Sequence, residues 1–243
     1  MYETLIKMTP EFVKSAIRFV FQPYSFHLSQ AGQDLWVFGE MFNEKKAGFF
    51  LDVGAHDGVL ISNTYLLERK YLWNGICIEA NPDSFRQLQR NRRATCIHAC
   101  VDSTARLVNF VKRGMQGGIL SSDTDNKEGS NETEEIFQVE TKTLESILVE
   151  SKAPFEIDYL SVDIEGSEQR VLGSFDFGKY RFKCLTIERP TELLRNILKE
   201  NDYVLVKDIP GLDCFYIHKS AVEEYSANVF EFYRKKRLTL RWR

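Results

Sequence analysis

The strongest constraint on the fold is a series of short apolar runs that alternate with helical patterns. Apolar residues on both faces of a strand indicate a parallel sheet that helices cover on both sides. The last two runs are joined by a short turn around Pro210-Gly211, which has no room for a crossover helix, so the final strand is expected to be antiparallel. The predicted fold is therefore α/β, built from seven main strands and a short extra strand at 107–111. The seven main strands are expected at 49–53, 76–79, 95–101, 159–163, 184–188, 203–206 and 214–217.

A glycine turn follows the first strand and reads Asp52-Val53-Gly54-Ala55-His56-Asp57-Gly58. A turn between a strand and a helix is the context that a nucleotide-binding loop requires. Glu79 ends the next strand, where an acid can accept hydrogen bonds from both ribose hydroxyls of an adenosine. A dinucleotide needs glycine where His56 stands, whereas S-adenosylmethionine carries no phosphate and tolerates acids beside its two positive charges. The turn favours S-adenosylmethionine, and a glycine turn without a ligand stays open.

The longer pattern resembles the FkbM-type methyltransferase family over about residues 29–218. The resemblance implies a class I methyltransferase fold, which is a Rossmann-like three-layer sandwich around a seven-stranded, mostly parallel sheet whose last strand is antiparallel. It also implies S-adenosylmethionine as the donor and O-methylation of a hydroxyl on a sugar, glycan or related natural product. His56 is a mild departure, because Asn or Tyr often stands there in the family. The segments that carry the resemblance are Ser29–Asp34, Phe50–Gly58, Ser62–Thr64, Cys77–Pro82, Gly117–Ser121, Leu160–Gly166 and Thr186–Pro190.

The resemblance also implies a donor site. In this site the residues of the glycine turn border the methionine part of S-adenosylmethionine, and Glu79 holds the ribose. Asp102 lies near the adenine amino group, and Asp163 and Ile164 lie closest to the methyl group that is transferred. The complete set of expected donor-binding residues is Asp52, Gly54, Ala55, His56, Asp57, Gly58, Asn63, Glu79, Ala80, Asn81, Asp102, Asp163 and Ile164.

The chemistry of methyl transfer suggests the catalytic candidates. Alignment and exclusion of water do most of the work in an in-line displacement, and a base helps to remove the proton of a hydroxyl. Asp163 is the first candidate for this base, followed by Glu165, Glu188 and His56. Alternatively, Asp163 with Glu165 or Glu188 binds Mg²⁺, which acidifies the hydroxyl. The polar segment 112–135 is expected to be either a lid over the site or disordered.

Two other functions are compatible with these residues. One is a metal-dependent sugar-nucleotide glycosyltransferase that uses Asp163-Ile164-Glu165 as its acidic pair, although no basic cluster for a diphosphate is evident nearby. The other is a module that binds S-adenosylmethionine or a glycan without turnover.

Composition and the two ends suggest the wider setting. We expect one domain, with a helical extension at 1–28, a catalytic core at 29–218 and a basic helix or tail at 219–243. A formal net charge of −3 gives no indication of nucleic-acid binding, so the expected partner is a small-molecule or glycan acceptor. Five cysteines, mostly in apolar runs, and no secretion signal are typical of a cytoplasmic protein. Six of the last ten residues are basic, which suggests either a solvated tail or weak contact with a membrane surface.

Overall fold

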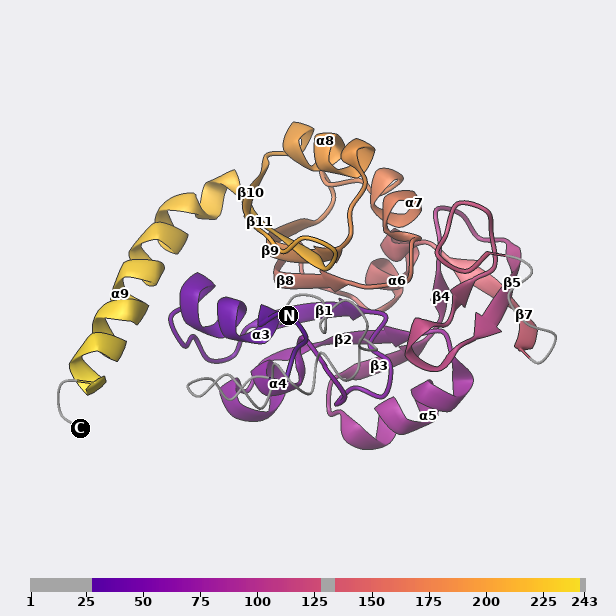
Figure 1. The fold of residues 1–243 in the computed structure, drawn as a ribbon, viewed down its shortest axis with the longest axis horizontal. Coiled ribbons are helices and arrows are strands. Elements are labelled where there is room, and N and C mark those ends of the chain that lie inside the picture. The colour runs from indigo at the N-terminus through magenta and orange to yellow at the C-terminus, as the bar shows by residue number, and fades with distance from the viewer. Residues whose placement is uncertain (1–27, 128–133, 241–243) are drawn as a thin grey trace, which may run out of the picture.

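The computed structural model describes residues 28–127 and 134–240, with side chains as far as 235 (Figure 1). The helix expected near the N-terminus lies outside the described residues. Seven strands form the main sheet in the order β10-β11-β9-β8-β1-β2-β3. Their bounds are Phe49–Val53 for β1, Asn74–Glu79 for β2, Thr95–His98 for β3, Glu156–Val162 for β8, Arg181–Glu188 for β9, Tyr203–Asp208 for β10 and Asp213–His218 for β11.

The pairing directions confirm the predicted topology. β1 pairs in parallel with β2 and β8, and the parallel pairs β2–β3 and β8–β9 extend the sheet on both sides. β11, the last strand in the chain, lies between β9 and β10 and is antiparallel to both. This strand order is that of the class I methyltransferase fold. The strand order reverses beside β1, which is where open α/β sheets bind ligands beyond their carboxyl ends.

Strand alternation divides the core into two layers. In β1, Leu51 and Val53 are buried in one cluster, whereas Phe50 points to the opposite face and joins the other. The first cluster is closed by α6 (Leu144–Glu150), α7 (Glu168–Gly173) and α8 (Glu192–Glu200). The second is closed by α3 (Gln33–Leu35), a π-helical segment (Trp36–Met41), α4 (Tyr65–Tyr71), α5 (Pro82–Asn91), a 3-10 turn (Lys219–Ala221) and α9 (Val222–Leu240). The result is the three-layer sandwich that the resemblance implied.

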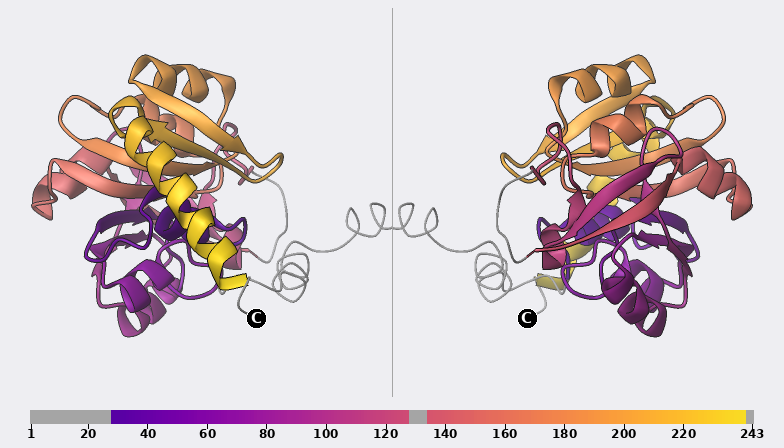
Figure 2. Two further views of the ribbon diagram at one scale, coloured as in Figure 1. Left: turned by 90° about the vertical axis from the view of Figure 1, so that its left-hand side faces the viewer. Right: turned by 90° about the vertical axis from the view of Figure 1, so that its right-hand side faces the viewer.

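The C-terminal helix α9 runs along one end of the molecule, away from the small sheet described below (Figures 1 and 2). Phe232 anchors this helix, because its buried ring packs closely against Gly39. A Cβ at position 39 would lie only 2.5 Å from the ring. Among the described basic side chains of this helix, Arg234 pairs with Glu231 and Lys235 donates to Asn43. In the described part of the chain, none of the helices is both long and apolar enough to span a membrane. Contact of the basic end with a membrane surface stays a prediction.

A second, smaller sheet lies beside β3 and differs from the sequence expectation. It has the order β4-β7-β5-β6, with bounds Cys100–Val101, Glu135–Lys142, Leu107–Lys112 and Gly118–Ile119 in that order. The strand expected at 95–101 therefore breaks after His98, and Cys100 and Val101 pair with the end of β7 instead. Within 112–135, the described residues include a 3-10 turn (Gly114–Gln116), strand β6 and a turn whose Asp125 N–H donates to the carbonyl of Glu165 in the loop after β8.

Candidate functional site

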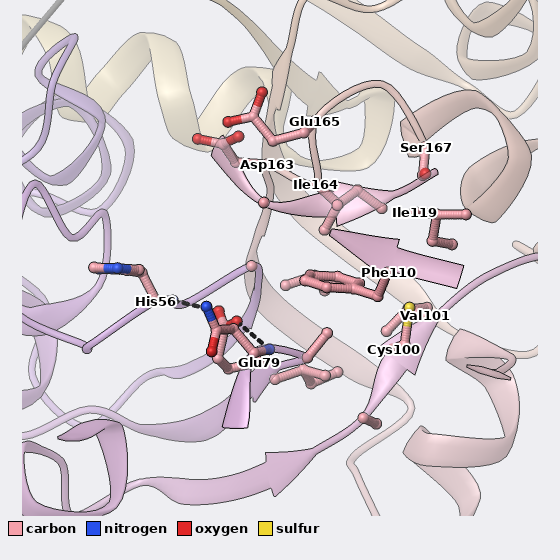
Figure 3. A pocket seen from close by; sticks show the side chains of 18 of the residues that line it. His56, Glu79, Cys100, Val101, Phe110, Ile119, Asp163, Ile164, Glu165 and Ser167 are labelled. Atoms are coloured by element: carbon pink, nitrogen blue, oxygen red, sulfur yellow. Dashed lines mark hydrogen bonds between the residues drawn. The ribbon is translucent and has the colours of Figure 1, made fainter. Parts of the chain in front are cut away.

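Two adjoining clefts open beyond the carboxyl ends of β1, β2 and β8. The narrow cleft lies between these strand ends and the small sheet, and its empty space of about 580 Å³ includes open solvent (Figure 3). The wide cleft is larger, and its empty space of about 2430 Å³ also includes open solvent. Residues that line both clefts, and so mark their junction, are Gly54, His56, Met115, Asp163 and Glu165.

The glycine turn holds the ends of β1 and β8 together at this junction. Gly54 has a φ of +88°, and a Cβ on it would lie 1.8 Å from the carbonyl oxygen of Asp163. The backbone N–H of Asp163 donates to the carbonyl of Val53 at 3.0 Å. Only glycine permits such an approach, so the glycine turn and the start of the loop after β8 are in direct contact.

Glu79 lies at the floor of the narrow cleft with both carboxylate oxygens fixed by backbone donors. The N–H of His56 donates to Oε2 at 2.8 Å and the N–H of Asn81 donates to Oε1 at 2.7 Å (Figure 3). Burial raises the pKa of Glu79, and these two hydrogen bonds partly offset that effect. Each carboxylate oxygen accepts two hydrogen bonds, so Glu79 keeps acceptor capacity for a ligand in the cleft.

The upper wall of the narrow cleft is apolar. Phe110 and Ile119 reach it from the small sheet, and Ile164 lies beside them from the loop after β8 (Figure 3). Phe110 is buried and its ring contacts the ring of Phe137 at a centroid distance of 5.3 Å. This apolar wall opposite the Glu79 carboxylate suits a ligand with one flat apolar part and one hydroxyl-bearing part.

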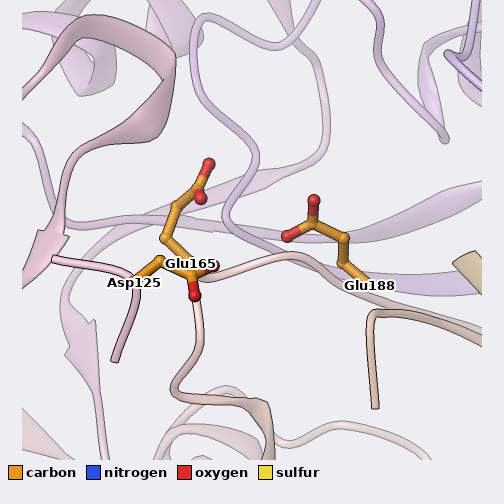
Figure 4. A group of neighbouring side chains, drawn as sticks. All are labelled: Asp125, Glu165 and Glu188. Carbon is orange, nitrogen blue, oxygen red and sulfur yellow. The ribbon is translucent and has the colours of Figure 1, made fainter. Parts of the chain in front are cut away.

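Acidic side chains gather where the two clefts meet. Burial, with repulsion from Glu188 and Glu165, raises the pKa of Asp163 well above its usual range. Burial and the charge of Glu188 raise the pKa of Glu165 to about 7. The neighbouring carboxylates of Asp125, Glu165 and Glu188 come from three separate segments (Figure 4). The site therefore holds carboxyl groups that retain protons near neutral pH.

Arg189 neutralises part of this negative charge. Its Nη2 lies 2.7 Å from Asp125, 2.8 Å from Glu188 and 3.4 Å from Glu165. Glu165 and Arg189 have φ values of +54° and +40°, conformations that are rare for residues with side chains. Such backbone strain is concentrated at functional sites.

Comparison with known proteins identifies the family. A family model described as the methyltransferase FkbM domain matches residues 52–205. The chain belongs to this family. It is a family of S-adenosylmethionine-dependent methyltransferases, and the matched region contains the glycine turn, Glu79, Asp163 and Glu188. None of the curated proteins matches the sequence.

Several solved structures are similar to this FkbM-family chain at low sequence identity. A methyltransferase FkbM from Methylobacillus flagellatus KT is 17% identical, with a TM-score of 0.44 over 71% of this chain and 44% of that one. A TehB-like SAM-dependent methyltransferase from Corynebacterium glutamicum is 8% identical, with a TM-score of 0.39 over 86% of this chain and 96% of that one. A methyltransferase from Pyrococcus furiosus is 13% identical, with a TM-score of 0.38 over 86% and 96%. The chain thus spans less than half of the Methylobacillus protein.

Most donor-binding residues expected from the FkbM resemblance lie at the clefts. The narrow cleft is lined by Gly54, His56, Glu79, Ala80, Asn81, Asp163 and Ile164. Three more border only the wide cleft, namely Asp52, Ala55 and Asn63. Asp57, Gly58 and Asp102 line neither cleft.

Asp57 and Gly58 shape the turn from behind. Asp57 accepts from the N–H groups of Val59 and Leu60, and the His56 side chain, 3.7 Å from its carboxylate, lowers the Asp57 pKa to about 2. A Cβ on Gly58 would lie 2.6 Å from the side chain of Leu88 on α5, so glycine allows the turn to pack on that helix.

Asp52 belongs to a buried network beneath the turn. Its carboxylate accepts from the hydroxyl of Thr64 at 2.5 Å and lies 4.0 Å from the buried guanidinium of Arg92. Arg92 in turn donates to Glu68 at 2.9 Å. This network ties β1 to α4 and α5.

Asp102 is held by two arginines. Its buried carboxylate lies 2.7 Å from Arg106 and 3.1 Å from Arg170. The adjacent residues Cys100 and Val101 line the narrow cleft in its place. Contact between Asp102 and an adenine amino group therefore stays a prediction, and the structure shows the carboxylate engaged in ion pairs.

The structure adds two buried acids that line neither cleft but support the site, and the sequence patterns did not indicate them. Glu168, at the start of α7, accepts from the N–H of Ile164 at 2.8 Å and so holds the loop after β8; burial raises its pKa to about 7. Asp213 accepts from Gln33 at 2.7 Å, and burial raises its pKa to about 6. Glu168 follows Asp163 by five residues and is the first residue of α7, a position where acids are favoured. The Gln33–Asp213 pair, 180 residues apart, has no local signal.

Proposed function

We propose that this protein transfers a methyl group from S-adenosylmethionine to a hydroxyl of a sugar, glycan or related natural product. The observation that carries the proposal is the junction of two clefts, one with the Glu79 carboxylate opposite an apolar wall and the other larger and bordered by acidic side chains. A group transfer needs donor and acceptor sites that meet at the reacting atoms. Gly54, Asp163 and Glu165 stand at that junction.

The residues of the narrow cleft fit the donor. Glu79 would accept hydrogen bonds from the ribose hydroxyls, with Ala80 and Asn81 beside it. The apolar wall of Phe110 and Ile119 would receive the adenine. When bound, S-adenosylmethionine supplies an electrophilic methyl group next to a sulfonium charge. The Asp163 carboxyl at the junction offers the electrostatic partner for that charge.

The acids at the junction support proton removal from an acceptor hydroxyl. We propose Asp163 as the base, with Glu165 as the second candidate and Glu188 and His56 farther down the order. A carboxyl whose pKa is raised is a stronger base, once ionised, than an ordinary one. A positive charge placed beside Asp163 favours its ionised form, so donor binding would prepare the base.

Direct acid–base catalysis is favoured over Mg²⁺ by the position of Arg189. The guanidinium already lies against Glu165 and Glu188, two of the three acids that a cation at Asp163, Glu165 and Glu188 would need. A sugar-nucleotide glycosyltransferase would need cationic groups for a diphosphate. Arg113 and Arg189, the arginines that line the wide cleft, are paired with carboxylates.

The test is methyl transfer from labelled S-adenosylmethionine to a panel of monosaccharides and methyl glycosides. We expect transfer that EDTA leaves unchanged and that falls about 10²–10⁴-fold in Asp163→Asn, as expected for loss of a general base. Binding of S-adenosylhomocysteine to the variant serves as the control for folding and donor binding. Tight binding of a UDP-sugar without any response to S-adenosylhomocysteine would reverse the proposal, and binding without transfer would favour a non-catalytic module.

A further inference from the structure

Unpartnered polar atoms gather on the wall of the wide cleft. Among the side chains that the structure describes, six have a buried nitrogen or oxygen without a hydrogen-bond partner, and three of these line this cleft. They are His56 Nδ1, Asn63 Oδ1 and Asn126 Nδ2. Buried polar groups are nearly always hydrogen-bonded, so a group of exceptions in one cleft indicates where a ligand supplies the partners.

Asn126 is the most deeply buried of the three, with 1% of its surface exposed. Its Oδ1 accepts from Nη1 of Arg113 at 2.8 Å. A guanidinium only donates, so the amide atom that faces it must be the oxygen, and the NH₂ group must point the other way. Arg113 is itself fixed by two hydrogen bonds of 2.7 Å to Glu134. The orientation of the Asn126 amide is therefore set by its surroundings.

The amide nitrogen lies beside Gly118, which lines the narrow cleft, and near Glu165 at the junction of the clefts. A Cβ on Gly118 would lie 2.5 Å from Asn126 Nδ2 and 3.4 Å from the Cβ of Glu165. Glycine at 118 thus leaves room for the NH₂ group beside Glu165. The same turn is docked on the loop after β8, because the N–H of Asp125 donates to the carbonyl of Glu165 at 3.0 Å. Asn126 Nδ2 is a fixed donor close to the acids of the site.

We propose that Asn126 is a specificity-determining residue that donates a hydrogen bond from Nδ2 to an oxygen of a polyhydroxylated acceptor. The inference rests on the proposed function and deepens it, because it names a contact and a substrate class for the wide cleft. A polyol offers oxygen atoms to Asn126 and hydroxyl protons to the nearby carboxylates of Asp125 and Glu165. An apolar acceptor with one hydroxyl would offer fewer oxygen atoms to the buried amide nitrogen of Asn126.

The test follows the Asn126 side-chain amide by NMR in isotope-labelled protein saturated with S-adenosylhomocysteine. The probes are methyl α-glucopyranoside, methyl α-galactopyranoside, methyl α-mannopyranoside and myo-inositol, and the amide signal is assigned from its loss in Asn126→Ala. We expect at least one polyol to shift the signal and to bind about ten-fold more weakly to Asn126→Ala, the usual effect of one lost hydrogen bond. Asn109→Ala, at an exposed position on β5, is the matched control and should bind like the wild type.

Three results would overturn the inference: a polyol that binds without shifting the Asn126 signal, equal affinity for both alanine variants, or no binding of any of the four probes. Titration of S-adenosylhomocysteine into the same samples separates these results from a failure of the proposed function. Where that titration shows no donor binding in the wild type, the proposed function fails. The polyol titration, repeated without S-adenosylhomocysteine, then still decides the inference.

Discussion

Replacing Gly54 with alanine tests the tight junction between the glycine turn and the loop of Asp163. The new Cβ would lie 1.8 Å from the carbonyl oxygen of Asp163, far inside any real contact, and the residue would keep a φ of +88°. The unfavourable backbone conformation costs about 1–2 kcal/mol. Forcing extra atoms into a packed site costs about 1–3 kcal/mol more. We therefore expect the free energy of unfolding to fall by about 2–5 kcal/mol.

Gly211→Ala is the matched control because it separates the two contributions. Gly211 has a φ of +76°, but a Cβ there would have no atom within 4 Å. This variant should therefore lose only the backbone contribution of about 1–2 kcal/mol. Each kcal/mol shifts the Tm of a chain of this size by about 2–4 °C, so calorimetry resolves the difference.

Binding provides the second measurement on the same pair. Gly54→Ala should also weaken S-adenosylhomocysteine, because the end of β8 must move away from the turn, whereas Gly211→Ala should retain full affinity. Equal losses of Tm in the two variants would refute the claim that the β1 turn and the β8 loop are packed in contact.

Two further predictions concern charge at the site. The folded-state pKa of Glu168, about 7 against an ordinary 4.5, means that the folded protein holds this proton between those pH values; stability should therefore fall as pH rises through this window. Glu168→Gln should reduce this loss of unfolding free energy between pH 5 and pH 8 by up to about 3 kcal/mol, measured by urea unfolding at both pH values. The same pH dependence in the variant and the wild type would contradict this prediction. The sulfonium charge beside Asp163 and Glu165 should make S-adenosylmethionine release more protons on binding than S-adenosylhomocysteine does. Calorimetry at pH 7 in buffers of different ionisation enthalpy measures this, and equal release would show that those carboxyls do not sense the donor.

The main sheet could be predicted because its strands are buried on both faces and therefore leave continuous apolar runs in the sequence. β7 left no such signal. It carries Glu135, Gln138 and Glu140 at exposed positions, and the chain around it is polar. The apolar spacing of Leu35, Phe38 and Met41 does predict a helix, but it does not indicate that Trp36–Met41 is π-helical.

The positions of several acids at the site could be predicted because the carboxyl ends of parallel strands meet at one edge of a sheet. This rule placed Glu79, Asp163 and Glu188 at the clefts from their positions alone. The same rule could not predict the ion pair between Asp102 and Arg170, because these two residues meet only in the tertiary structure. Nor could it show the NH₂ group of Asn126, whose direction depends on Arg113 and on the space beside Gly118.

The most direct test of the account is calorimetric binding of S-adenosylhomocysteine to the wild type, Glu79→Gln and Glu192→Gln. Glu192, whose side chain is 90% exposed, is the control for loss of one negative charge. We predict micromolar binding to the wild type and to Glu192→Gln. Glu79→Gln should bind about 10- to 150-fold more weakly, the range for lost hydrogen bonds to a charged group. Undiminished binding to Glu79→Gln, or no binding to the wild type, would contradict the claim that the narrow cleft holds the nucleoside of the methyl donor.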